Sequence, residues 1–157
     1  MQDKIMWSVV YLFNPDLSEV LFVHKNRGPF PGKLNGVGGK FDREKDTYAG
    51  GVFTPFTMMN ACARREIMEE TGALLDESQL HLLLKETFFD EHQFGAELWI
   101  YCGIVEKDSI LQLEDEKQVW YRVISVFNPQ NGKDLAGNGN IPYHIRLSLL
   151  KLQEIQK

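Results

Sequence analysis

Three glutamates in the middle of the chain, Glu66, Glu69 and Glu70, are spaced so that they would share one edge of a helix. At about 100° per residue, Glu70 lies about 40° from Glu66, and Glu69 lies about 60° away on the other side. This edge overlaps the flank of an apolar stripe that contains Ala63 and Ile67, so the carboxylates should be partly shielded. Like charges at this spacing repel, and a hard divalent cation with oxygen ligands would remove the repulsion. The pattern predicts a Mg²⁺ site, and the alternative is an acidic helix face in water.

A glycine-rich basic segment, residues 24–40, is the second candidate for chemistry. It contains no Asp or Glu, although the chain has a net charge of −5. Its basic residues and its later glycines are Lys25, Arg27, Lys33, Lys40, Gly36, Gly38 and Gly39. Glycine lets the backbone approach an anion closely, so the segment suits phosphate contact; the alternative is a surface turn with solvated lysines. A cation site beside a phosphate-binding loop indicates cleavage of a phosphoanhydride.

The elements that must position these groups can be read from the apolar pattern. A turn at 14–16 separates two short apolar runs, which predicts a β-hairpin. Thr54 suits a helix N-cap, Pro55 its first turn and Gly72 its end, which predicts a helix over 55–71. The predicted strands are 6–13, 20–24, 82–89, 97–105 and 119–127, the second helix is 141–156, and 42–54 is a loop. This order predicts an α/β or α+β domain with a mixed sheet between helices, and we favour α/β.

Length and composition narrow the class of protein further. The chain has 157 residues, 43% hydrophobic and 25% charged, which fits one globular domain. A net charge of −5 argues against a protein that coats extended nucleic acid or an anionic membrane. No apolar run approaches the roughly 20 residues of a membrane span, and the first residues do not read as a secretory signal. Cys62 and Cys102 form no disulfide framework, so we expect a cytoplasmic protein.

The run from Arg65 to Gly72, with Gly39 upstream, resembles the Nudix box, GX5EX7REUXEEXGU, in which U is bulky and apolar. Every defined position of its REUXEEXG half is matched, and Ala73 stands at the final U. The family has 14 residue steps between its first glycine and its arginine, whereas Gly39 and Arg65 are 26 steps apart. The resemblance therefore implies an insertion around 42–54. Glu44 or, alternatively, Asp46 would replace the family's first glutamate, which orients the box arginine.

The resemblance implies a single domain over 1–157 with the Nudix-type α/β/α sandwich. It implies Mg²⁺, or Mn²⁺ in its place, held by Glu66, Glu69 and Glu70 with help from the Gly39 carbonyl. Arg65 would be structural and would orient the glutamates. A further carboxylate often joins from a later loop, and in Glu114-Asp115-Glu116 we favour Glu116 as metal ligand or general base. Glu66, Glu69 and Glu116 are thus the expected catalytic residues.

Residues 20–40 are also similar to the matching segment of MutT-type enzymes, which hydrolyse oxidised purine nucleoside triphosphates. In those enzymes an asparagine at the position of Asn35 contacts the base. The expected substrate-binding residues are Lys25, Arg27, Asn35, Gly38, Lys40 and Asn138, and Asn140 is a further candidate for a base edge. The expected reaction converts a nucleoside triphosphate to monophosphate and pyrophosphate. The alternatives are nucleotide sugars, dinucleoside polyphosphates or capped RNA as substrates, or a nucleotide-sensing module without turnover. The expected partner is a small nucleotide, with no extended nucleic acid or membrane, and the protein a monomer or homodimer.

Overall fold

A computed structural model describes residues 5–26, 31–47, 54–89, 95–135 and 140–156. Its strands are β1 (Ile5–Phe13), β2 (Glu19–His24), β3 (Leu34–Asn35), β4 (His81–Phe89), β5 (Gly95–Ile104) and β6 (Gln118–Arg122). Its α-helices are α1 (Pro55–Thr71), α2 (Val123–Val126) and α3 (Asn140–Gln156). Short 3₁₀ helices lie at Glu77–Gln79, Lys107–Ser109 and Pro129–Asp134. No helix in these ranges has the length and apolar character needed to cross a membrane.

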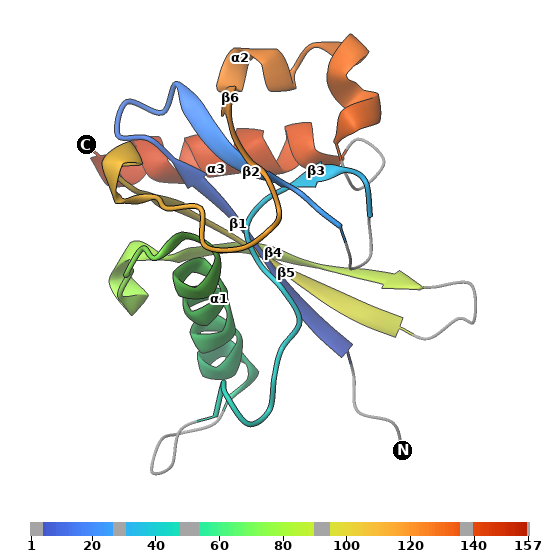
Figure 1. The fold of residues 1–157 in the computed structure, drawn as a ribbon, viewed down its shortest axis with the longest axis vertical. Coiled ribbons are helices and arrows are strands. Elements are labelled where there is room, and N and C mark those ends of the chain that lie inside the picture. Colours follow the sequence, from blue (N-terminus) through green and yellow to red (C-terminus); the bar gives the residue numbers. More distant parts are fainter. Residues whose placement is uncertain (1–4, 27–30, 48–53, 90–94, 136–139, 157) are drawn as a thin grey trace.

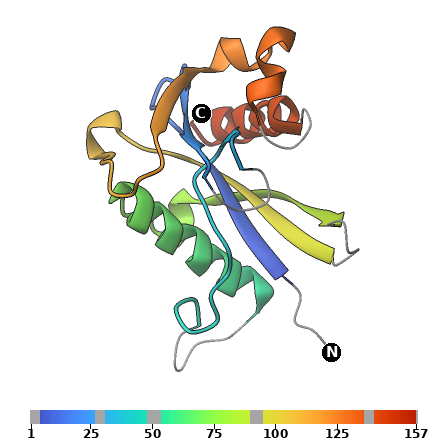
Figure 2. The same ribbon diagram turned by 45° about the vertical axis from the view of Figure 1, so that its right-hand side comes forward.

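The strands form one mixed sheet in the order β3-β2-β1-β5-β4, with β6 paired to β2. β1 pairs with β5 in parallel along its whole length, and its last two residues, Leu12 and Phe13, pair with β2 in antiparallel. Helices α1 and α3 lie on opposite sides of the sheet (Figures 1 and 2). This arrangement confirms the predicted α/β class, the mixed sheet and the opening hairpin.

Strand β1 shows how the sequence builds a core on each face. Because side chains alternate along a strand, Tyr11 and Phe13 belong to the core beneath α3, whereas Val10 and Leu12 belong to the core beneath α1. All four are essentially buried. The near-continuous apolar run that predicted this strand is therefore the signature of a strand covered on both faces.

Helix α1 has the bounds that its capping residues predict. The Thr54 hydroxyl accepts a hydrogen bond from the Thr57 N–H at 3.2 Å, and Pro55 occupies the first turn. Gly72 closes the helix with φ = 77°, a conformation that is unfavourable for residues with a side chain. The buried side of the helix, including Cys62, Ala63 and Ile67, packs on the sheet. Helix α3 begins one residue before its predicted start and ends at the predicted residue.

The predicted strand over 119–127 is wrong in its second half. β6 ends at Arg122, which pairs with Glu19, the first residue of β2. Beyond that point no strand remains for β6 to pair with among the described residues, and the Val123 N–H instead donates to the Ser18 carbonyl at 2.9 Å. Residues 123–126 turn into the short helix α2, so the end of the partner strand overrides the strand propensity of Val123 and Val126.

The glycine-rich segment takes the place of β2 beside the first half of β1. The Ser8 N–H donates to the Gly39 carbonyl at 2.8 Å, and the Val10 N–H donates to the Val37 carbonyl at 2.6 Å. β3 is a two-residue strand within this segment, which the sequence did not predict. These bonds hold residues 36–40 against the sheet, on the side where α1 ends.

Candidate active site

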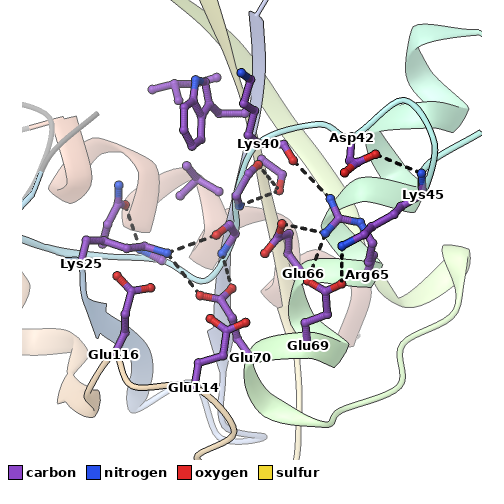
Figure 3. Close-up of a pocket in the computed structure, with 18 residues that line it drawn as sticks. Lys25, Lys40, Asp42, Lys45, Arg65, Glu66, Glu69, Glu70, Glu114 and Glu116 are labelled. Atoms are coloured by element: carbon purple, nitrogen blue, oxygen red, sulfur yellow. Dashed lines mark hydrogen bonds and ion pairs between the residues drawn. The ribbon is translucent and has the colours of Figure 1, made fainter. Parts of the chain in front are cut away.

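A cavity of about 420 Å³ lies between the glycine-rich segment, α1, the 114–116 loop and the first half of β1. Figure 3 shows that the glutamates of α1 and of the 114–116 loop face it together with Lys25, Lys40 and Lys45. One wall is apolar, since Trp7, Val9 and Leu98 line it. The cavity therefore combines glutamate carboxylates, lysine ammonium groups and an apolar wall. These are features of a site for an anionic ligand that also has an apolar or aromatic part.

Arg65 is held by a buried carboxylate from the 42–47 segment. Its Nε donates to Asp46 Oδ1 at 2.7 Å and its Nη2 to Asp46 Oδ2 at 3.0 Å, and the Asp46 side chain is fully buried. This two-point pairing raises the pKa of Arg65 and keeps the guanidinium charged. Of the two candidates for this role, Asp46 is the partner, and Glu44 is an exposed residue whose N–H bonds to Asp42.

Two further Arg65 contacts orient two of the three helix glutamates. Nη1 donates to Glu66 at 2.9 Å and to Glu69 at 3.1 Å. Glu66 packs so closely on Gly39 that a Cβ there would lie 2.5 Å from its carboxylate. Burial raises the pKa of Glu66, and the neighbouring Arg65 opposes the shift. Glu69 is 38% exposed and also lies 3.8 Å from the ammonium of Lys45.

Glu70 is the most buried of the helix glutamates and bonds to the glycine-rich segment. It accepts hydrogen bonds from the Gly38 N–H at 2.9 Å and from the Lys25 ammonium at 3.4 Å. A Cβ on Gly38 would lie 2.0 Å from the Ser8 carbonyl oxygen, so only glycine brings this N–H to Glu70. Burial raises the pKa of Glu70 to about 7, even though Lys25 opposes the shift.

Glu70 also gathers with Glu114 and Glu116, and one oxygen from each lies within 4.8 Å of the others. The loop before β6 creates this approach because it binds the last carbonyls of α1, which have no partner within the helix. The Leu111 N–H donates to Thr71 O at 2.8 Å, and Gln118 Nε2 donates to Glu70 O at 3.2 Å. The Asn26 N–H donates to Glu116 at 2.6 Å, which draws the loop toward the basic segment.

The carboxylate sets fit a divalent cation. Mg²⁺ and Mn²⁺ prefer oxygen ligands, and a buried glutamate that is hard to ionise alone is stabilised by such a charge. Among the described residues, the group that could converge on one ion is Glu70, Glu114 and Glu116. The predicted set of Glu66, Glu69 and Glu70 lines the same cavity, with Glu66 and Glu69 bonded to Arg65. The predicted Gly39 carbonyl accepts hydrogen bonds from Ser8, so an ion there would compete with β1.

The predicted substrate-binding residues fall into three groups. Lys25, Asn35, Gly38 and Lys40 line the cavity. Arg27 and Asn138 lie outside the described residues. Asn140 is described, and its side chain donates to Glu86 at 3.0 Å.

Sequence reasoning did not single out Lys45, and it named Glu114 only as a neighbour of Glu116. Lys45 reaches the cavity through the fold of the 42–47 segment, for which no motif exists. Glu114 could have been found from its acidic loop, but its approach to Glu70 depends on the hydrogen bonds that tie that loop to α1.

Comparisons with known proteins bear on the family and the fold of the chain. A family model described as the NUDIX domain matches residues 4–138. No curated protein sequence matches the chain. The NUDIX domain of Shewanella oneidensis NrtR, solved with ADP ribose, is 15% identical, with a TM-score of 0.68 over 97% of this chain and 90% of that one.

Two further solved structures are similar. A MutT NUDIX hydrolase from Burkholderia pseudomallei is 17% identical, with a TM-score of 0.65 over 93% of this chain and 98% of that one. A MutT/nudix family protein from Enterococcus faecalis is 16% identical, with a TM-score of 0.59 over 78% of this chain. The chain covers 45% of the Enterococcus protein, less than half its length. At these identities the similarity establishes the fold.

Proposed function

The chain belongs to the Nudix family, and on this premise we propose that it hydrolyses nucleoside diphosphates linked to a further group. The proposed substrates are nucleoside triphosphates, including oxidised ones, and the products are a monophosphate and pyrophosphate. The observation that carries the proposal is the meeting of three lysines and five glutamates in one cavity beside an apolar wall. Lysines attract the phosphates, glutamates hold a cation, and an apolar wall suits a base.

The lysines and the glycine-rich backbone would bind the phosphates. Lys25 and the Gly38 N–H both point at Glu70, and a substrate phosphate held by a cation there would share the same donors. Lys40 lies further along the same cavity. Arg27 is retained as a phosphate contact, and Asn138 as a contact to the base, on the sequence alone.

We assign the cation, Mg²⁺ or Mn²⁺, to Glu66, Glu69 and Glu70, and we add Glu114 and Glu116 as further candidate ligands. When bound, it supplies positive charge that neutralises phosphate oxygens and makes water more acidic. Burial raises the pKa of Glu70 and of Glu66, because a buried carboxylate charge is unfavourable. A bound cation would compensate that charge and so stabilise both carboxylates.

Glu116 is the proposed general base or additional ligand. Its carboxylate accepts one N–H from Asn26, which fixes its direction and leaves other lone pairs for a water or a cation. Arg65 orients Glu66 and Glu69 and is itself fixed by Asp46. A water positioned between such carboxylates can lose a proton as it attacks phosphorus, while the phosphoanhydride bond breaks.

Asn35 is the proposed base contact at the edge of the cavity. Its side-chain oxygen accepts the Gly36 N–H at 2.8 Å, which fixes the amide. The apolar wall of Trp7, Val9 and Leu98 would pack against a base face. We propose the cytoplasm as the compartment because Cys62 and Cys102 are both buried free thiols.

The test is a panel of nucleotides assayed for pyrophosphate and phosphate release with Mg²⁺. The panel contains canonical and oxidised deoxynucleoside triphosphates, ADP-ribose, nucleotide sugars and a diadenosine polyphosphate. We expect turnover of triphosphates, reduced at least about 100-fold by Glu69→Gln because a ligand carboxylate is worth several kcal/mol to a metal-assisted reaction. Glu154→Gln, an exposed glutamate on α3, is the matched control and should leave turnover unchanged.

The outcome also separates the alternatives. Turnover of a nucleotide sugar or a dinucleoside polyphosphate, but of no triphosphate, would keep the chemistry and replace the substrate. Tight nucleotide binding with no turnover on any member would overturn the hydrolase proposal in favour of a nucleotide-sensing module.

A further inference from the structure

A buried polar network lies on the sheet face beneath α3, on the side away from α1. The Tyr11 hydroxyl on β1 is 2.8 Å from Nδ1 of His144 on α3. Nε2 of the same histidine bonds to the carboxylate of Glu86 on β4. The side chains of Tyr11 and His144 are buried, whereas that of Glu86 is 25% exposed. Neither the metal site nor the phosphate site uses these residues.

Hydrogen-bond chemistry fixes the direction of each bond in this network. An ionised carboxylate only accepts, so His144 Nε2 must carry the proton that it shares with Glu86. Burial lowers the pKa of His144, although Glu86 opposes the shift, and in the neutral imidazole Nδ1 accepts from the Tyr11 hydroxyl. Asn140 Nδ2 donates to the second oxygen of Glu86 at 3.0 Å. Both oxygens of the carboxylate are therefore oriented from α3.

The strand register places Glu86 next to the cavity wall. Glu86 pairs with Leu98 of β5, and Leu98 pairs with Trp7 of β1, so the three form one row across the sheet. Leu98 and Trp7 line the cavity. Directly paired side chains on one face lie about 5 Å apart, so Glu86 is one strand beyond the apolar wall. The adjacent residue Lys85 points to the opposite face, where its ammonium lies 4.9 Å from the Trp99 ring centroid.

Among the described residues, two side chains hydrogen-bond to the carboxylate of Glu86, fewer than its oxygens can accept. Two carboxylate oxygens offer about four lone-pair sites, and His144 and Asn140 occupy one on each oxygen. The Glu86 side chain is 25% exposed, so it is accessible in part to a ligand packed on the wall. A fixed and partly exposed carboxylate matches two adjacent N–H donors, as it does in bidentate pairs.

We propose that Glu86 is a specificity residue that reads the edge of a nucleobase packed on Trp7 and Leu98. It favours bases whose edge presents N–H donors and rejects edges that present acceptors. Guanine, with a ring N–H beside an exocyclic amine, fits best; hypoxanthine offers the ring N–H alone; adenine offers an acceptor at that ring position. His144 and Asn140 are positioning residues for this carboxylate. The inference rests on the proposed function, since it names the base of the same substrate.

The experiment measures equilibrium binding of GMP, IMP and AMP by calorimetry, and kcat/KM for the corresponding triphosphates, for the wild type and Glu86→Gln. The amide keeps the shape of the side chain but replaces one acceptor with donors. We expect the wild type to prefer guanine over adenine, and Glu86→Gln to reduce that preference about 10- to 100-fold. Lys85→Gln is the matched control on the same strand and should keep the preference.

Binding of the monophosphates tests the role of Glu86 independently of whether the protein hydrolyses triphosphates. A lost preference in monophosphate binding supports Glu86 even if no triphosphate is turned over. Equal losses for all bases in Glu86→Gln, or an unchanged preference, would overturn the proposal while leaving hydrolysis intact, because the network would then serve only to hold α3. A wild type that binds all three bases equally, or binds none, would also overturn it. His144→Asn tests the positioning role. It should reduce the preference for guanine over adenine, and its unfolding midpoint, measured in parallel, shows whether the variant still folds.

Discussion

The two sides of the acidic cavity balance their charges in different ways. On the side that we call the Arg65 flank, Asp46, Glu66 and Glu69 all bond to one guanidinium. On the Glu70 flank, Glu70 gathers with Glu114 and Glu116, and the ammonium of Lys25 lies 3.4 Å from Glu70. Burial raises the pKa of Glu70 to about 7, a sign that one lysine does not compensate for the buried charge.

This difference suggests a division of labour between the flanks. On the Arg65 flank the guanidinium bonds to every carboxylate and compensates part of their charge without a cation. The Glu70 flank is the part that a cation would stabilise, because its carboxylates face one another at short range. Loss of Asp46, which holds the guanidinium, should therefore cost mainly stability, whereas loss of a carboxylate on the Glu70 flank should cost mainly metal binding and turnover.

The largest expected effect is on stability and comes from Asp46→Asn. Asp46 makes the two-point pair with Arg65, and Glu66 and Glu69 compensate the guanidinium only in part, so loss of Asp46 should cost about 3 kcal/mol of unfolding free energy. Urea unfolding measures the loss, and Glu44→Gln is the control because Glu44 is exposed and should change stability by less than about 0.5 kcal/mol. Equal effects of the two substitutions would show that Asp46 is not the partner that matters.

Glu70→Gln should act in the opposite direction on stability and strongly on turnover. Without metal, the uncharged amide avoids the cost of burying a carboxylate, so the unfolding midpoint should stay level or rise. With Mg²⁺, turnover should fall about 100-fold, which corresponds to about 2.7 kcal/mol. Titration calorimetry with Mn²⁺ checks metal binding, and unchanged affinity would remove Glu70 from the ligand set.

The pH dependence of stability should distinguish the flanks in the metal-free protein. The pKa of Glu70 is about 7 in the folded state, against an ordinary glutamate value of 4.5, so between these values the folded state holds the extra proton. Stability should therefore fall as pH rises through this window, by an amount on the order of 2 kcal/mol. Urea unfolding in EDTA at about pH 5 and pH 7.5 measures it. Glu70→Gln should lose most of the dependence; if it kept all of it, the charge would lie elsewhere.

Lys45→Gln should have the smallest effect. Its ammonium lies 3.8 Å from Glu69, and both side chains are well exposed, so the pair contributes less than about 0.5 kcal/mol. The comparison of Lys45→Gln with Lys25→Gln in KM for the best substrate is more informative. Because the Lys25 side chain is only 14% exposed and lies beside Glu70, its loss should raise KM more. A larger effect of Lys45→Gln would indicate that the phosphates lie nearer the Arg65 flank.

Local patterns were enough to predict much of the fold. Capping residues defined α1 from Thr54 to Gly72, and alternating or continuous apolar runs predicted the strands. The sequence overextended β6 because strand propensity carries no information about where the partner strand ends. β3 was not predicted because a strand of two residues is too short to show an alternating apolar pattern.

The site was predictable where a motif is local and ambiguous where the contact is long-range. The spacing within α1 placed Glu66, Glu69 and Glu70 together, but it could not decide whether Glu44 or Asp46 meets Arg65, since that depends on the path of the 42–47 segment. The spacing also could not predict that Glu114 lies near Glu70, because the hydrogen bonds that place it there join residues far apart in the chain.

The parallel pairing of β1 with β5 has a consequence for how the protein folds. Val9 pairs with Ile100, so the strand that carries the glycine-rich segment on one edge depends on a strand from the second half of the chain on the other. Such long-range pairing must overcome a large loss of chain entropy before it gains any contact, and it therefore forms slowly. During synthesis the glycine-rich segment and α1 emerge first, yet they cannot face each other across a finished sheet until β5 arrives. We expect the cavity to be among the last parts of the molecule to become ordered.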